Sequence, residues 1–132
     1  MEKLTRYGTA VVIAHAVMVA FHALAHQMLP VPLSWSQGLF IGMVIVLAPI
    51  FAVVLLWTRF SRTGTVILFG SMTGALAFGL YNHFIRIGSD HVSQIPDTEW
   101  GILFQITAVL LAATEGVGVW GLNHKQPTEA NL

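Results

Sequence analysis

Apolar residues along this chain of 132 residues fall into four long stretches, and short polar segments separate them. The stretches cover approximately residues 5–29, 36–59, 64–88 and 98–122. Each can supply the roughly 20 helical residues that cross a bilayer. Pro30 and Pro32 end the first stretch, and Ser34 or Ser36 is placed to cap the second. The pattern predicts a single-domain, all-α integral membrane protein with four transmembrane helices in an up-down-up-down bundle, followed by a polar tail over 123–132.

The composition agrees with a protein that uses lipid as its solvent. Hydrophobic residues make up 55% of the chain and charged residues 9%, which is more apolar surface than a soluble domain of this length can bury. The net charge is zero and no basic run is present, so nucleic acid is not expected as a partner. The chain has no cysteine, which excludes disulfides, thiolate catalysis, iron–sulfur clusters and cysteine-type zinc sites.

The basic residues predict the orientation of the bundle. Five of the six fall on one side, in the N-terminal segment, the middle loop and the tail: Lys3, Arg6, Arg59, Arg62 and Lys125. Arg86 alone lies near the other side. Because short cytoplasmic loops are enriched in Lys and Arg, we expect a multi-pass protein of the cell (inner) membrane with both termini in the cytoplasm.

The first stretch has an alternative interpretation as a cleaved signal peptide. It combines a charged head, an apolar run and the sequence Ala23-Leu24-Ala25, which resembles a cleavage site. His15 and His22 interrupt the apolar run, however, and the run continues beyond the cleavage point. These two features favour a retained transmembrane helix.

A set of polar side chains gathers near the outer face of the predicted bundle. His22 and His26 are four residues apart and therefore share one face of the first helix. His83 lies near the end of the third helix, and Asp90 and His91 follow in the next loop. At 1.5 Å of rise per residue, the three helical histidines lie within about 10 Å of the outer face.

These residue types suit a metal ion. Two imidazoles from one helix, a third from another helix and a carboxylate from a covering loop are a donor set for zinc, copper or iron. The candidate ligands are His22, His26, His83, Asp90 and His91. A b-type haem is the alternative cofactor, held axially by His22 or His26 on one side and by His83 on the other.

A second polar pair is predicted deeper in the membrane. His15 and Glu115 each lie about 20 Å from the outer ends of their helices, by the same rise per residue. A carboxylate and an imidazole that meet inside a membrane cost less free energy than either group alone. They are candidates for proton transfer, and the plainer alternative is a core histidine that is hydrogen-bonded to Glu115.

Several local signals predict how the helices are shaped and packed. Pro49 should kink the second helix, with a neighbouring group taking the carbonyl that it frees. Asp97 is the expected N-cap of the fourth helix. Small residues of the third helix are expected to admit a neighbouring backbone and to turn the His83 face toward protein: Gly70, Ser71, Gly74, Ala75 and Gly79.

Three classes of function fit this sequence. The first is a metal- or haem-binding membrane protein, with redox or enzymatic activity as one option. The second is a non-catalytic structural subunit that meets a membrane-protein partner or another copy of itself within the lipid bilayer. The third is a proton or small-solute pathway through the polar residues.

Overall fold

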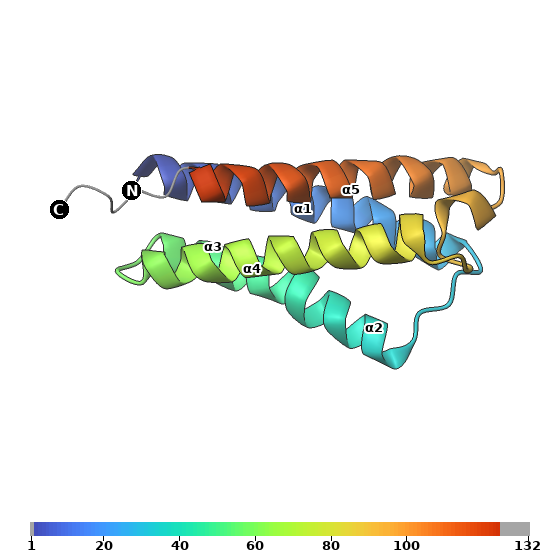
Figure 1. Ribbon diagram of the computed structural model, residues 1–132, viewed down its shortest axis with the longest axis horizontal. Helices are drawn as coiled ribbons and strands as arrows, with labels where there is room; N and C mark the ends of the chain where they lie inside the picture. Colours follow the sequence, from blue (N-terminus) through green and yellow to red (C-terminus); the bar gives the residue numbers. More distant parts are fainter. Residues whose placement is uncertain (1, 125–132) are drawn as a thin grey trace.

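The computed structural model describes residues 2–124 and has the predicted fold class, a bundle of four apolar spans (Figure 1). Each span is long and apolar enough to cross a membrane. The elements are α1 (Glu2–Met28), α2 (Trp35–Phe40), the π-helical η1 (Ile41–Leu47), α3 (Ala48–Leu56), α4 (Ser61–Leu80), the π-helical η2 (Tyr81–Ile85), the 3₁₀ turn η3 (Val92–Gln94) and α5 (Glu99–His124). Of the predicted polar tail, Asn123 and His124 continue α5, and residues 125–132 lie outside the described residues.

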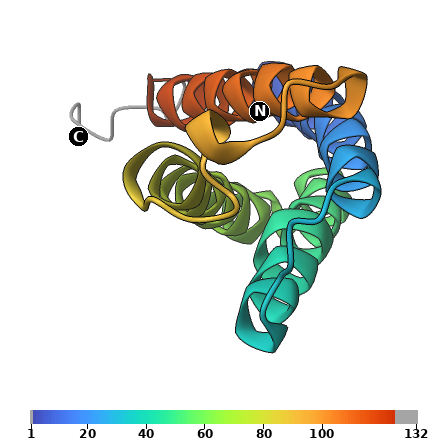
Figure 2. The same ribbon diagram turned by 90° about the vertical axis from the view of Figure 1, so that its right-hand side faces the viewer.

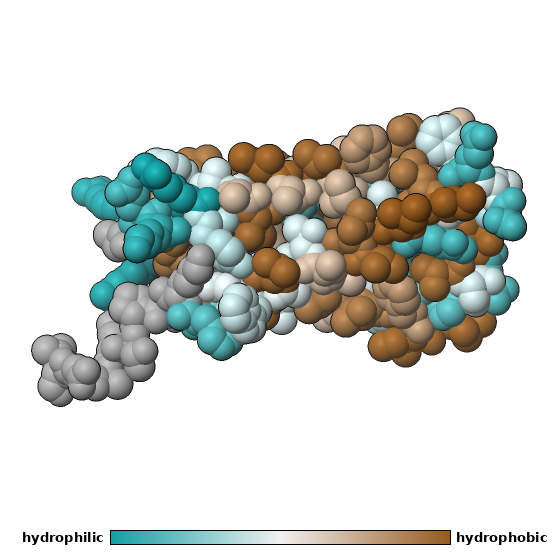
Figure 3. All heavy atoms as spheres, turned by 90° about the horizontal axis from the view of Figure 1, so that it is seen from above, coloured by the Kyte–Doolittle hydropathy of each residue, from teal (hydrophilic) through white to brown (hydrophobic). Residues whose placement is uncertain are grey.

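The spans alternate in direction, as the sequence predicts. The start of α1, the end of α5 and the loop between α3 and α4 lie together at one end, which we call the terminal end (Figure 1). The connections 29–34 and 86–98 lie at the other end, the loop end. α1 packs most extensively on α5 and α3 on α4, so α1 and α4 are diagonal neighbours. Hydrophilic side chains gather toward the two ends, with a hydrophobic band between them (Figure 3).

The terminal half of the bundle is closely packed. Its core combines buried residues from all four spans, namely Val11, Val12, Ala52, Leu56, Leu68, Met72 and Leu122. Glycines allow the close contacts: a Cβ atom on Gly64 would lie 2.8 Å from the Ala52 carbonyl oxygen, and one on Gly121 would overlap the Tyr7 ring. The Tyr7 hydroxyl donates a hydrogen bond of 2.6 Å to the Val117 carbonyl. Side chains larger than hydrogen are therefore excluded at these crossing points.

The glycines that are expected to admit a neighbouring backbone along α4 do not do so, although Ser71 and Ala75 of the same set are buried. Gly70 is exposed and faces open space, and a Cβ atom on Gly74 would lie 3.3 and 3.6 Å from the side chains of Val44 and Phe40. The α3 backbone instead approaches α4 one and a half turns earlier, at Gly64. The rotation of α4 about its axis sets this position, and an apolar sequence does not encode that rotation because lipid and protein interior are equally apolar.

The second span departs from regular α-helix before Pro49. Pro49 has no N–H to offer to the Ile45 carbonyl four residues earlier, and η1 widens the helix at this point. His15 of α1 takes the freed acceptor, with its Nε2 at 3.1 Å from the Ile45 oxygen. As expected, a neighbouring helix satisfies the carbonyl. Toward the loop end, α2 diverges from the other spans (Figures 1 and 2).

The helix caps agree with the sequence at one position and differ at another. Ser34 caps α2 in a capping box with Gln37, as predicted. The α5 cap is Thr98, whose hydroxyl accepts from the Gly101 N–H at 3.1 Å, so the assignment to Asp97 is wrong by one residue. The threonine is three residues before that amide, which is the spacing that an N-cap requires.

Candidate metal centre

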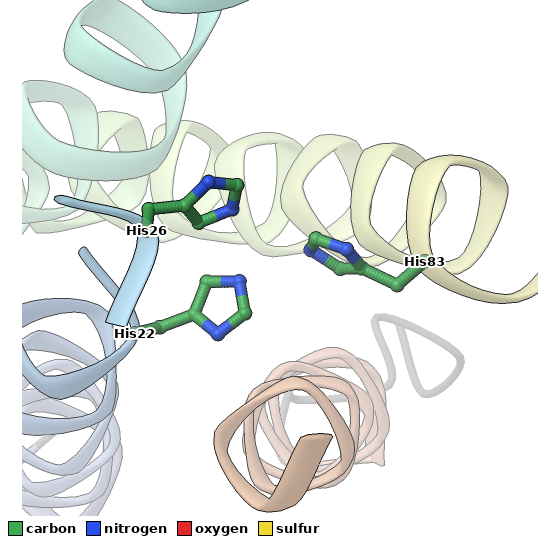
Figure 4. A group of neighbouring side chains, drawn as sticks. All are labelled: His22, His26 and His83. Atoms are coloured by element: carbon green, nitrogen blue, oxygen red, sulfur yellow. The ribbon is translucent and has the colours of Figure 1, made fainter. Parts of the chain in front are cut away.

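Three imidazoles from two diagonal spans converge near the loop end. α1 supplies His22 and His26 and η2 supplies His83, and the rings turn toward one another (Figure 4). One ring nitrogen from each histidine lies within 4.8 Å of the other two. The His22 ring centroid is 4.9 Å from that of His26 and 4.9 Å from that of His83. The helices that the bundle keeps apart elsewhere therefore meet through this cluster.

The π-helical turn η2 places His83 inside the bundle. The Arg86 N–H donates to the Tyr81 carbonyl five residues earlier, at 2.7 Å, which widens the helix by one residue. Both Asn82 and His83 are buried as a result. The Asn82 side chain donates to the Phe78 carbonyl at 2.9 Å and accepts from Gln37 of α2 at 3.2 Å. η2 is thus tied to the diverging second span.

Thr107 of α5 fixes the protonation of His22. The Thr107 hydroxyl lies 2.7 Å from the Leu103 carbonyl, which can only accept, so the hydroxyl proton points there. His22 Nδ1 is 2.8 Å from the same oxygen and must therefore be the donor. We assign the Nδ1–H tautomer, which leaves the Nε2 lone pair free. Nε2 is buried and has no hydrogen-bond partner among residues 2–124.

Asp90 orients the other two histidines. His83 Nδ1 donates to the Asp90 backbone carbonyl at 3.0 Å, which leaves the lone pair on Nε2. The carboxylate oxygen Oδ1 of Asp90 lies 3.3 Å from both His83 Nδ1 and His26 Nε2. His26 Nδ1 is buried and has no hydrogen-bond partner within the described residues, and the same holds for Asp90 Oδ1.

Asp90 brings a negative charge to this cluster. It lies in the connection 86–98, outside the four spans. Burial alone would raise the pKa of its carboxyl group, but the interactions with His26 and His83 outweigh burial and hold that pKa below its ordinary value. The group is therefore ionised at neutral pH. Three imidazoles and one carboxylate gather here with no cationic side chain among them.

Phe104 of α5 closes the cluster on one side. Its ring is fully buried, and its centroid lies 4.6 Å from that of His22, 4.9 Å from that of His26 and 5.3 Å from that of His83. An apolar ring at this position keeps water away from the imidazoles and limits their rotation. Phe104 thus shields one side of the cluster from water.

A cavity of about 310 Å³ adjoins the cluster on another side. His22, His26, His83 and Asp90 all line it, and Glu115 lines it as well. Most of the remaining wall is apolar and comes from all four spans and from the connection 29–34. A molecule inside this cavity would therefore reach the imidazoles directly.

His15 and Glu115 form the deeper pair that the sequence suggests. His15 Nδ1 lies 3.6 Å from Glu115 Oε1, and both side chains are buried. His15 Nε2 carries a proton because it donates to the Ile45 carbonyl. One further proton, on either His15 Nδ1 or the Glu115 carboxyl group, makes the pair neutral overall, which is the inexpensive state at membrane depth.

His91, the remaining candidate ligand, lies outside the cluster of three histidines. Its Nδ1 accepts from the Ser93 N–H at 3.1 Å and lies 2.8 Å from the Ser93 hydroxyl. The His91 side chain thus caps the short turn η3. Met28, a soft ligand close in sequence, is 53% exposed on the outside of the bundle. The donor atoms near the cavity are thus nitrogen and oxygen.

Thr107 and Phe104 are site residues that the sequence does not reveal. Thr114, on the same helix, makes the same bond to the carbonyl four residues earlier, at 2.7 Å, and faces outward. Nothing in the sequence distinguishes these two threonines. Phe104 is one of eight phenylalanines in a membrane protein, where an aromatic ring carries no signal of its own.

The fold and the cluster together define a class: a helical protein able to span a membrane four times, with a buried histidine cluster that could hold a metal ion. Comparisons with protein-family models, curated proteins and solved structures find no match. Function is therefore inferred from the geometry of the site.

Proposed function

We propose that this protein binds one transition-metal ion through His22, His26 and His83, with Asp90 as the fourth ligand or as the group that orients the imidazoles. The observation that carries the proposal is the set of buried ring nitrogens without partners, on His22 and His26. Buried polar atoms in folded proteins nearly always have a partner, because an unpaired one costs free energy. A cation at the cluster would provide a partner for such a lone pair.

The spacing of the imidazoles supports a bare ion. Nitrogen ligands lie about 2.0 Å from zinc, so two of them are about 3.3 Å apart in a tetrahedral site. The donor atoms here lie within 4.8 Å of one another, and rotations of the side chains would bring them onto one ion. The hydrogen bonds to Thr107 and to the Asp90 backbone carbonyl place the protons of His22 and His83 on Nδ1. The Nε2 lone pair of each ring is therefore available to a metal ion.

A haem fits less well. A macrocycle between His22 and His83 would have to enter where their ring centroids are 4.9 Å apart and where His26 and Phe104 contact both rings. Binding would require these side chains to leave the cluster. We therefore favour an ion over the porphyrin.

The donor set favours a divalent ion such as zinc or iron, with copper(II) also compatible. Imidazole binds all three metals, and a carboxylate adds one negative charge to balance the ion. Cu(I) prefers thiolate and thioether ligands, which the cluster lacks. If Asp90 does not coordinate the ion, three imidazoles leave one coordination position open toward the cavity. The ion would act there as a Lewis acid or a redox centre.

Metal analysis of the protein purified in detergent tests this proposal. We expect about one equivalent of metal per chain, or uptake of one equivalent of Co²⁺ with visible d–d absorption. A His22→Ala/His83→Ala variant should lose this binding, and His124→Ala should keep it, because His124 bonds to the Trp120 carbonyl at the terminal end. A folded protein that takes up no Zn²⁺, Co²⁺, Cu²⁺ or Fe²⁺ would contradict the proposal.

The cavity supports a second candidate, a proton pathway, because it joins Glu115 to the histidine cluster. A carboxyl group and imidazoles on one cavity can pass protons through bound water. Reconstituted vesicles with a pH gradient test it: passive proton flux should exceed that of empty vesicles and fall in Glu115→Gln. Equal flux in all three preparations would exclude this candidate.

A further inference from the structure

The cavity beside the histidine cluster has a shape that suggests what the metal would act on. It runs from the cluster to Glu115, and the eight residues between Thr107 and Glu115 of α5 correspond to about 12 Å of helix. Small side chains line its length, among them Ala23, Ala75, Ala108 and Ala112. The lining is therefore mostly apolar, and it includes both the histidine cluster and Glu115.

A larger side chain would fit at Gly79, which borders the cavity. A Cβ atom on Gly79 would meet nothing closer than 3.9 Å, where Glu115 Oε2 lies, and Gly79 lies between Glu115 and His83. In contrast, Gly64 and Gly121 in the terminal half are in tight contact with neighbouring atoms. Alanines and a glycine that leave space unfilled give up packing contacts, and interiors in general are filled closely.

The second span provides a wall that is shaped around this space. Ile41 and Ile45 line the cavity from η1, and Val31 and Leu33 line it from the connection before α2. α2 diverges from the bundle there (Figure 2). The hydrogen bond from Gln37 to Asn82 joins it to η2, and the Phe40–Phe78 ring stack, with centroids 4.9 Å apart, joins it to the last turns of α4. Ile41 and Ile45 belong to a span that is long and apolar enough to cross a membrane, whereas Val31 and Leu33 precede it.

We propose that the cavity binds a lipid-soluble molecule with a metal-binding oxygen group at one end and a slender apolar chain that extends from the cluster toward Glu115. The inference rests on the proposed metal site, since the ion would hold the polar end. The apolar walls would hold the chain, and the His15–Glu115 pair would form the inner limit. Such a ligand reaches the site from the membrane, where it is already concentrated.

A chain-length comparison on the cobalt-loaded protein tests this proposal. The probes are octanohydroxamate and acetohydroxamate, which offer the same metal-binding group with a long and a short chain. Their binding is followed by the change in cobalt absorption. Because each buried methylene contributes roughly fourfold in affinity, we expect octanohydroxamate to bind at least about 100-fold more tightly.

Two neighbouring alanines of α5 give a matched control. Ala112 lines the cavity, and Ala113 is exposed on the outside of the bundle. Ala112→Leu should reduce the chain-length preference to less than about tenfold, since the added side chain occupies the space, and Ala113→Leu should retain it. Val19→Phe fills the cavity from α1 and should act like Ala112→Leu.

The cobalt absorption distinguishes failure of the proposed metal site from failure of the proposed lipid-soluble ligand. If cobalt binds in all variants and the chain-length preference is the same in Ala112→Leu, Val19→Phe and Ala113→Leu, the preference comes from the detergent micelle and the proposal is overturned. Equal affinity of the two probes for the wild type would overturn it as well. A folded wild type that shows no cobalt absorption and takes up no Zn²⁺, Cu²⁺ or Fe²⁺ would overturn the metal site itself and, with it, this inference.

Discussion

Small residues have two roles in this bundle: some allow close contact between helices, and others border open space. In the terminal half, Gly64, Gly118 and Gly121 are in close contact with a neighbouring helix, and a Cβ atom on Gly121 would overlap Tyr7. In the half toward the loop end, Gly79 and several alanines border a cavity of about 310 Å³. One half holds the helices together, and the other keeps space beside buried histidines. We therefore expect substitutions at the tight glycines of the terminal half to affect stability, and substitutions beside the cavity to affect the proposed metal site.

The two halves also differ in backbone geometry, because the departures from regular α-helix border the cavity. α3 and the first turns of α4 are regular, whereas the two π-helical segments of the described chain, η1 and η2, border the cavity end. π-helical turns are rare and occur often at functional sites, because the extra residue redirects a side chain. Here η2 turns His83 inward, and η1 presents the Ile45 carbonyl to His15.

The largest expected effect concerns the histidine half and its response to metal. At a metal concentration 100 times the dissociation constant, binding to the folded state should stabilise the wild type by about 2.7 kcal/mol. His22→Ala/His83→Ala should show no metal-dependent stabilisation, since two of three imidazoles are gone. Thermal unfolding in detergent, with and without Zn²⁺, measures this difference. Equal stabilisation of both proteins would place the metal elsewhere.

A comparison of two threonines tests the orientation of His22. Thr107→Val removes the oxygen that holds His22 Nδ1, and we expect the affinity for Co²⁺ to fall by about ten- to hundredfold, as is usual when a group that orients a ligand is lost. Thr114→Val removes an equivalent local hydrogen bond at a half-buried position outside the histidine cluster and should leave the affinity unchanged. Competition titration with a chelator provides the measurement. Equal effects of the two substitutions would mean that Thr107 acts on the helix and not on the imidazole.

The same substitution at two glycines compares the packing of the halves. Gly121→Ala introduces a methyl group into the Tyr7 contact and should destabilise the protein by about 1–3 kcal/mol. Gly79→Ala points into the cavity and should leave stability unchanged or raise it by about 0.5–1 kcal/mol, because alanine favours helix over glycine. Denaturant unfolding in mixed micelles reports both values. Similar losses for the two variants would remove the contrast between the halves.

The smallest effect is expected at His91, a candidate ligand by sequence that bonds to Ser93 in this structure. His91→Ala should change the free energy of metal binding by no more than about 0.5 kcal/mol, the usual limit for a residue outside the site. A loss comparable to that of His22→Ala would show that the connection 86–98 rearranges to bring His91 onto the ion.

Much of the site could be predicted from the distance of each residue along its helix from the end of the apolar stretch. Helix rise fixes how far each residue lies from the membrane surface, and it places His22, His26 and His83 at one level and His15 with Glu115 at another. The structure brings both sets together, at the distances given above. Depth is readable because the ends of each apolar run mark the membrane boundaries.

Rotation and local helix geometry could not be predicted. Which face of a transmembrane helix meets protein is not encoded where the helix is apolar on all sides, so the sequence does not indicate the close contact at Gly64 or the role of Thr107. The π-helical turn at η2 depends on the tertiary contacts of Asn82 and His83, with no sequence signature of its own. The cap at Thr98 escapes prediction because Asp97 is an equally good capping residue one position earlier.

X-ray absorption spectroscopy of the zinc-loaded protein tests the central claim most directly. We expect one ion per chain with nitrogen and oxygen neighbours at about 2.0 Å and the outer-shell scattering of about three imidazole rings, which His22→Ala/His83→Ala abolishes. A folded protein that binds no zinc, or a bound ion whose spectrum shows no imidazole scattering, would contradict the assignment of His22, His26 and His83 as a metal centre.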